Sequence, residues 1–182
     1  MALDSWKVGF MNELIRYPSL PSKDELVAEW LRYRGGRFWQ RWATMSKRHP
    51  ENPGKRLKSA FALLAKHVTD PATLGCGMAN AMVATGSSDH PARQAIEAHK
   101  AKLRASLAAL CVGSGAAEPE RLAVELFLLM EGAQSTPILG VQAPARDVGP
   151  AAASLIDSRL AGEKGVRTLF LASDAQLPKK GS

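Results

Sequence analysis

The chain has 182 residues, of which 46% are apolar, 6% aromatic and 23% charged, and its formal net charge is +7. The apolar content excludes a disordered chain, and the length suits one domain of ordinary size with a sizeable core. No apolar run approaches the roughly 20 residues that a membrane-spanning helix needs, so a membrane protein is excluded. Cys76 and Cys111 are too few for a disulfide framework, and the start MALDSWKVGF lacks a secretory pattern, so we expect a cytoplasmic protein.

The positive charge is concentrated near the N-terminus. Residues 1–58 carry 12 basic and 6 acidic side chains, a net of +6, whereas residues 59–182 carry 12 and 11, a net of +1. The densest part contains Arg32, Arg34, Arg37, Arg41, Lys47, Arg48, Lys55, Arg56 and Lys58. Such a cluster attracts a polyanion such as nucleic acid, or else it is a solvated helix face. For the first four arginines of this list, Arg32 to Arg41, solvation is the favoured interpretation.

The first half of the chain has helical spacing throughout. Residues 1–21 contain one short amphipathic segment before Pro18 and Pro21. A long helix is predicted from Ser22, because Ser22-Lys23-Asp24-Glu25 has the form of a capping box. It runs to about Met45, and the pair Gly35-Gly36 inside it predicts a bend or a close contact.

Three further helices follow in chain order. The second covers about 55–68, the third is short and ends at Gly86, and the fourth runs from Pro91 to about Val112. Their expected inward residues are Leu57, Phe61, Leu64 and Val68; then Leu74, Met78, Met82 and Val83; then Ile96, Leu103, Leu107 and Leu110.

The last part contains two more predicted helices. The fifth begins near Glu118, is apolar on nearly every side and ends before Pro137, so it must be covered on more than one side, often by a partner subunit. The sixth covers about 145–162, and a tail follows over 163–182. No segment alternates as a strand does, so the sequence predicts an all-α, bundle-like fold.

No set of residues indicates catalysis or metal binding. Ser88, Asp89 and His90 are adjacent in a predicted turn, where a helix cap is the favoured interpretation over a nucleophile–base relay. The histidines and cysteines lack metal-ligand spacing, and no glycine-rich phosphate loop is present. We therefore predict no enzyme activity, no metal and no cofactor.

The order of these segments resembles that of TetR-family transcriptional regulators. The segment Ser22-Lys23-Asp24-Glu25-Leu26 resembles the start of the family's long linker helix, and Gly75-Cys76-Gly77-Met78-Ala79-Asn80-Ala81 is similar to a segment of one branch's sensor domain. Asp89-His90-Pro91-Ala92-Arg93 also fits that branch, and the helix ending at Ala133 resembles its dimer-forming helix. The resemblance covers about residues 20–162 and implies a helical sensor and dimerisation domain over 22–162.

The segment before Ser22 departs from the family pattern. The family places a three-helix DNA-binding unit of about 45 residues there, whereas 21 residues precede Ser22 in this sequence. We expect residues 1–21 to be an incomplete remnant of that unit, with DNA binding lost from this chain as one consequence. In the family pattern, Lys23 stands where a DNA phosphate is contacted; a solvated first-turn lysine is the alternative.

The resemblance also implies a homodimer and a small apolar or amphipathic effector bound in the helical core. The candidate ligand residues are Trp30, Phe38, Trp39, Phe61, Leu64, Met78, Asn80, Met82, His99 and Leu103, with ordinary core packing as the alternative for each. Asn80 and His99 are preferred, because a polar group on an inward face needs a partner. The candidate dimer residues are Leu122, Leu126, Leu129 and Leu155. The predicted function is ligand-responsive transcriptional regulation, and the alternative is a dimerising or ligand-binding module that does not touch DNA.

Overall fold

The computed structural model describes residues 22–70, 73, 75–85, 89–137, 139–140 and 146–174, and side chains as far as Ala161 with the exception of Ala84. These residues form six α-helices, α2 to α7, and contain no strand. The all-α prediction is therefore confirmed. The segment 1–21, with its predicted short helix, lies outside the described residues.

Helix α2 (Lys23–Ser46) begins where the capping pattern predicts. The Ser22 Oγ atom accepts a hydrogen bond from the backbone N–H of Glu25 at 3.2 Å, and the acidic residues Asp24 and Glu25 occupy the positive end of the helix dipole. The helix continues through Gly35 and Gly36. Gly35 is buried against neighbouring side chains, so the pair marks a close contact within a continuous helix.

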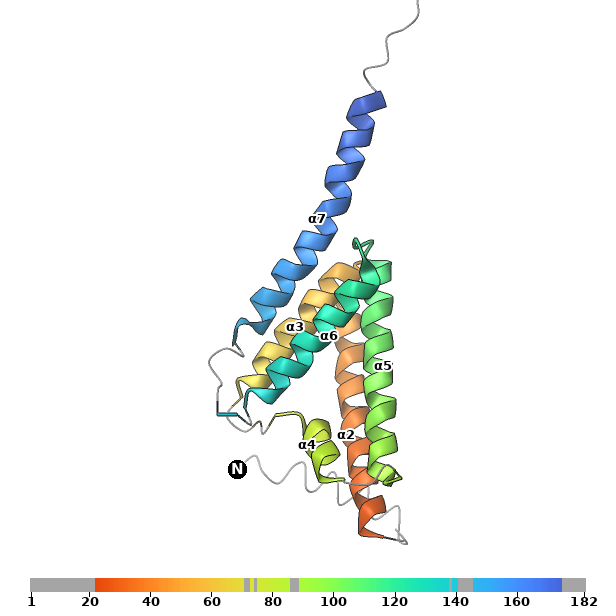
Figure 1. The fold of residues 1–182 in the computed structure, drawn as a ribbon, viewed down its shortest axis with the longest axis vertical. Coiled ribbons are helices and arrows are strands. Elements are labelled where there is room, and N and C mark those ends of the chain that lie inside the picture. Colours follow the sequence, from red (N-terminus) through yellow and green to blue (C-terminus); the bar gives the residue numbers. More distant parts are fainter. Residues whose placement is uncertain are drawn as a thin grey trace, which may run out of the picture. The chain divides into compact units, whose positions relative to one another are not determined.

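The described residues divide into two compact units, the first of which comprises residues 22–44 together with the described residues of Cys76–Leu103. It contains most of α2, the short helix α4 (Gly77–Ala84) and the first half of α5 (Pro91–Gly113), which are labelled in Figure 1. Its core is formed by Ala28, Leu31, Met78, Ala92 and Ile96. These residues come from all three helices, so packing across α2, α4 and α5 holds this unit together.

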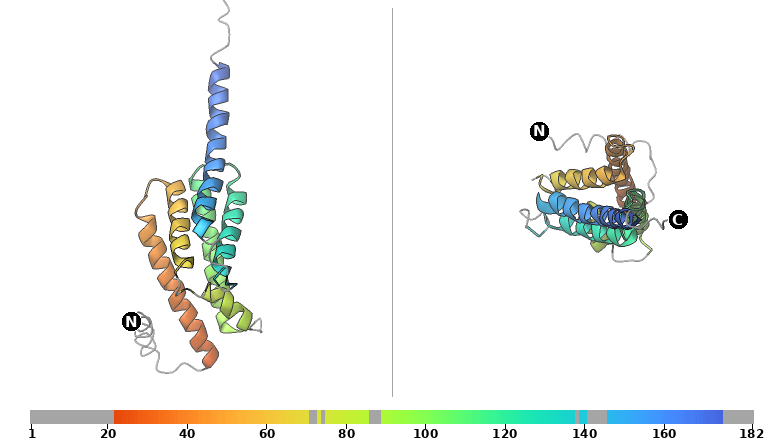
Figure 2. Two further views of the ribbon diagram at one scale, coloured as in Figure 1. Left: turned by 90° about the vertical axis from the view of Figure 1, so that its left-hand side faces the viewer. Right: turned by 90° about the horizontal axis from the view of Figure 1, so that it is seen from above.

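The second unit comprises the described residues of 45–75 and those from Arg104 to Asp174. It contains α3 (Pro53–Val68), the second half of α5, α6 (Pro119–Ser135) and α7 (Val148–Asp174). Helix α7 lies between α3 and α6 and contacts both (Figure 2). Helix α3 is capped by the Asn52 side chain, which accepts from the backbone N–H of Lys55 at 2.8 Å.

The predicted inward stripes of α3 and α5 are confirmed. Every expected residue is at most 9% exposed, namely Leu57, Phe61, Leu64 and Val68 on α3, and Ile96, Leu103, Leu107 and Leu110 on α5. Both helices have apolar residues at helical spacing with polar residues between them, so their inner faces are unambiguous.

Two expectations about the fold are wrong. Val83 is 88% exposed, because the face of the eight-residue helix α4 that carries Met78 packs into the core and Val83 lies away from that face. The last helix continues to Asp174, past the predicted end at 162. No helix in the described ranges is both long and apolar enough to cross a membrane.

Candidate functional site

An aromatic cluster, defined here as Phe38, Trp39, Trp42 and His99, gathers in the first unit. Three of its members are on α2, and His99 approaches them from α5. The His99 ring centroid lies 5.1 Å from that of Phe38 and 5.6 Å from that of Trp39, and Phe38 meets Trp39 edge-to-face at 5.1 Å. All four side chains are half-buried, so the cluster presents both apolar ring surface and an imidazole.

The His99 imidazole is held in a neutral form. Its Nδ1 atom is buried and has no hydrogen-bond partner within the described part of the chain. Burial, followed by the charges of Lys100 and Lys102, lowers the pKa of His99 to about 4. Charging this ring would add a cation to a desolvated place that already faces two lysines, so the ring is uncharged at neutral pH.

Gly35 makes room for this imidazole. A Cβ atom at position 35 would lie 3.3 Å from His99 Nδ1 and 3.3 Å from the terminal methyl Cε of Met78. The same construction at Gly36 meets nothing within 4 Å. Nδ1 and the Met78 methyl therefore face the same point on the bare backbone of α2.

The predicted ligand residues are distributed over both units. All except Phe61 and Leu64 fall in the first unit, and those two belong to the buried stripe of α3 in the second. Leu103 is buried, whereas Trp30 and Met82 are half-buried against the first unit's core.

Asn80 is exposed on α4, so its expected inward position is wrong. The helix buries Met78, two residues earlier, on the opposite side.

The turn before α5 is used for capping. The His90 Nδ1 atom accepts a hydrogen bond from the backbone N–H of Ala92 at 3.1 Å, and Pro91 is the first helical residue. The His90 Nε2 atom lies 3.5 Å from Asp24 Oδ1, which joins the starts of α5 and α2. The favoured capping interpretation is confirmed, with His90 as the capping side chain. Ser88 lies outside the described residues.

The two cysteines occupy different environments. The buried Cys111 thiol has its pKa raised to about 11 by desolvation, which makes it a poor nucleophile. Cys76 is half-buried, and the Lys100 Nζ atom lies 3.7 Å from its Sγ atom. Among the described residues, no three His, Cys, Asp or Glu side chains are grouped so as to hold a metal ion.

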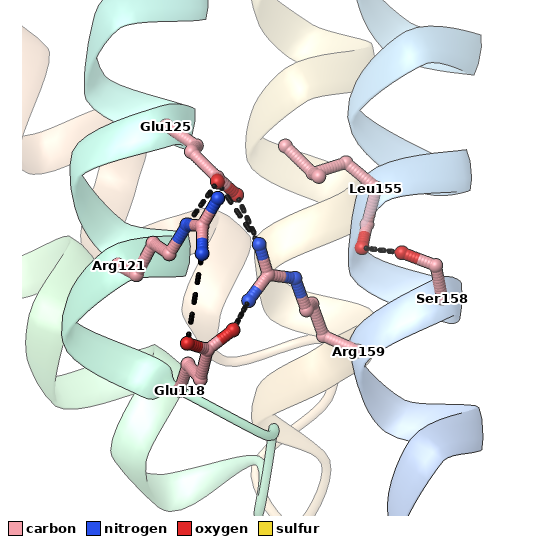
Figure 3. Close-up of polar contacts among 6 residues, drawn as sticks. All are labelled: Glu118, Arg121, Glu125, Leu155, Ser158 and Arg159. Atoms are coloured by element: carbon pink, nitrogen blue, oxygen red, sulfur yellow. Dashed lines mark hydrogen bonds and ion pairs between the residues drawn. The ribbon is translucent and has the colours of Figure 1, made fainter.

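In the second unit, Arg159 of α7 joins α7 to α6 (Figure 3). Its guanidinium donates to both carboxylate oxygens of Glu125, at 2.9 and 3.0 Å, and also to Glu118. Arg121 completes the network with Glu118 and Glu125. Because the Arg159 side chain is only 17% exposed, this pair is stronger than a typical surface ion pair. It holds α6 and α7 in register.

The expected dimer residues Leu122 and Leu126 are 0% exposed and pack inside the second unit, so their assignment to a subunit surface is wrong. Leu129 and Leu155 are half-buried. The outer face of α6, defined here by Val124 and Leu128, is 53% and 64% exposed at these two residues. Sequence periodicity missed this face because α6 is apolar on nearly every side, and helical spacing then fits two opposite faces equally well.

The basic side chains of α2 are partly committed to contacts within the chain. Arg32 pairs with Glu25 and Glu29, and the Arg34 guanidinium lies 5.0 Å from the Trp30 ring centroid. Lys23, Arg37 and Arg41 are exposed. Exposed positions suit a solvated face and a phosphate contact equally, so both interpretations of these side chains stay predictions.

No family model and no curated protein matches the sequence, but a solved structure matches its fold. It is the crystal structure of a protein from Streptomyces avermitilis that is assigned as a TetR transcriptional regulator. The match has a TM-score of 0.68 and 25% sequence identity, and it covers 79% of this chain and 78% of that one. The chain has the fold of a TetR-type transcriptional regulator. The resemblance found in the sequence motifs is thereby confirmed.

Proposed function

We propose that the chain acts as a dimeric, ligand-responsive regulator of transcription of the TetR type. The observation that carries the proposal is the fold match over 79% of the chain to a protein assigned as such a regulator. Sequence motifs from Ser22 to Ala133 and the fold comparison both point to the same family. The effector would be a small apolar or amphipathic molecule bound in the helical core, where it would shift the populations of two dimer conformations.

We assign the dimer contact to the outer face of α6 together with the neighbouring surface of α7. Val124 and Leu128 are one helical turn apart and leave an apolar patch exposed to water. In a two-fold dimer the same patch of each subunit meets its copy, so Val124 and Leu128 would pack against the same two residues of the partner subunit. The Arg159 network supports this assignment, because it fixes α7 beside the helix that carries the patch.

A gel-shift titration with the DNA upstream of the protein's own gene tests the regulatory function. A regulator that reads DNA retards this fragment in the presence of excess non-specific DNA. Lys23→Gln should weaken the complex severalfold if the amine meets a phosphate, and Arg41→Gln is the matched control because it removes another exposed charge from α2.

The second candidate function is a module that dimerises or binds the effector without touching DNA. Such a module does not read a DNA sequence, and the exposed cations of α2 would give it at most salt-sensitive binding to DNA without sequence preference. If excess non-specific DNA abolishes the gel shift equally for every DNA fragment tested, the binding has no sequence preference. That result would favour this module over the regulator.

A further inference from the structure

His90 uses both of its ring nitrogens at the place where α5 begins beside the start of α2. The Nδ1 atom accepts a hydrogen bond from the backbone N–H of Ala92 at 3.1 Å, and the Nε2 atom lies 3.5 Å from Asp24 Oδ1. A neutral imidazole carries its proton on one nitrogen, and the nitrogen that accepts must be the bare one. The cap therefore assigns the proton to Nε2, on the side of the Asp24 carboxylate.

A second proton changes these two contacts in opposite directions. It can add only to Nδ1, which then becomes a donor and no longer accepts from Ala92. The cation also stands at the positive end of the α5 dipole, where it is disfavoured. At Nε2, in contrast, a neutral donor becomes half of a charged pair with Asp24, and charged hydrogen bonds are the stronger ones. Protonation thus exchanges the cap of α5 for a stronger contact with α2.

The neighbouring helices bring one charged group into contact with this ring. The His90 side chain is only 17% exposed, so little water can replace either of its contacts. On α2 the ring meets the Asp24 carboxylate, whereas Glu25 is paired with Arg32 at 3.0 Å and Lys23 is exposed. The eight residues of α4, the third helix of this unit, include no charged side chain. Asp24 is therefore the partner through which α2 responds to the charge of the ring.

Two further charged residues lie on the same segment as His90. The Arg93 guanidinium is directed to Glu97 at 3.0 Å, one turn further along α5. Asp89 precedes the ring in the sequence and makes a contact of its own. The exchange that protonation causes takes place between the Ala92 amide and the Asp24 carboxylate, because these two groups meet the two ring nitrogens.

We propose that His90 is a proton-operated junction between the starts of α5 and α2. In the neutral form the ring caps α5, and in the protonated form it releases the Ala92 N–H and pairs with Asp24. Histidine side chains ordinarily change charge between about pH 5 and about pH 8, so such a junction responds to mild acidification. The inference goes beyond the proposed regulatory function and does not depend on it.

Nuclear magnetic resonance of the isotope-labelled full chain, titrated from about pH 8 to about pH 5, tests the inference. At the higher pH, the ring nitrogen shifts of His90 should place the proton on Nε2. On acidification, the protection factor of the Ala92 amide in hydrogen exchange should fall about fivefold, which is the loss that a cap of ordinary strength gives. The midpoint of this fall should coincide with the midpoint at which the His90 ring itself titrates.

Three variants separate the two contacts. His90→Asn retains a side chain that caps helices well and does not titrate, so Ala92 protection should no longer depend on pH. Asp24→Asn leaves the cap in place but should move the midpoint of the His90 titration to lower pH, because the protonated ring loses its charged partner. Glu25→Gln is the matched control, since it removes a carboxylate of the same turn that is paired with Arg32, and it should move the midpoint less. Circular dichroism of each variant confirms that the helices are retained.

The tautomer measurement needs only the wild-type chain, and a proton on Nδ1 at the higher pH overturns the inference. Protection of Ala92 that does not follow the His90 titration, or a response that persists unchanged in His90→Asn, does the same. Equal midpoint shifts in Asp24→Asn and Glu25→Gln overturn the part assigned to Asp24. None of these measurements involves DNA or a partner subunit, so each outcome leaves the proposed function to its own tests.

Discussion

The two adjacent glycines of α2 allow a direct test of the contact between α2 and His99. At an exposed helical position with open space, alanine in place of glycine stabilises a helix by about 0.5–1 kcal/mol, because glycine loses more backbone entropy on folding. Gly36 is such a position, since it is exposed and a Cβ atom there meets nothing within 4 Å. We therefore expect Gly36→Ala to raise the free energy of unfolding by that amount.

Gly35→Ala should have the opposite sign. Its Cβ atom would stand 3.3 Å from both His99 Nδ1 and the Met78 methyl, which is closer than most side-chain contacts. Met78 can yield, but the imidazole is held by Phe38 and Trp39. Overpacking of this kind costs about 1–3 kcal/mol and outweighs the gain in helix propensity. The net change is a loss of about 1 kcal/mol, which places the two variants about 2 kcal/mol apart.

Urea unfolding followed by far-ultraviolet circular dichroism measures both variants against the wild type. A midpoint for Gly35→Ala that equals or exceeds that of Gly36→Ala would refute the close contact, and with it the packing described for His99.

Three further predictions concern stability. The free energy of unfolding should fall by about 2 kcal/mol as the pH drops from about 6.5 to about 4. Burial lowers the pKa of His99 to about 4 in the folded chain, so the unfolded chain takes up the proton more readily. Solvent screening of the half-buried ring keeps the change at this size. In His99→Leu this part of the pH dependence should disappear, and an NMR titration giving His99 an ordinary pKa would contradict the reasoning. Arg159→Met should cost about 1–2 kcal/mol, whereas Lys58→Met, which breaks an exposed ion pair, should cost less than about 0.5 kcal/mol; equal losses in thermal unfolding would count against the network. Leu126→Ala should cost about 3 kcal/mol and Leu128→Ala less than about 1 kcal/mol in urea unfolding, and the reverse order would contradict the burial assigned to α6.

Helix positions and clear amphipathic faces could be predicted from the sequence. The Ser22 cap, the stripe of α3 from Leu57 to Val68 and the end of α6 before Pro137 follow from local chemistry, and the structure confirms each of them. The close contact at Gly35 could also be predicted, because glycine destabilises the interior of a helix and a pair of glycines there indicates a bend or a close contact.

The remaining features depend on tertiary packing, which local periodicity does not encode. The apolar run of α6 fits either of two faces, so the buried Leu126 and the exposed Leu128 could not be told apart. Val83 lies on a helix too short to establish a face by periodicity. The inward position of His99 was expected, but its neighbours come from α2 and α4, which are distant in the sequence, and the unpaired nitrogen could be found only in the structure.

The most direct test of the proposed function is whether the chain forms the dimer on which a TetR-type response depends. Sedimentation equilibrium at micromolar concentration compares the wild type with Leu128→Glu, which places a charge on the outer face of α6 without disturbing the buried Leu126. We predict twice the 19.5 kDa chain mass for the wild type and a folded monomer for Leu128→Glu. A monomeric wild type, or a Leu128→Glu variant that remains fully dimeric, would contradict the dimer assignment.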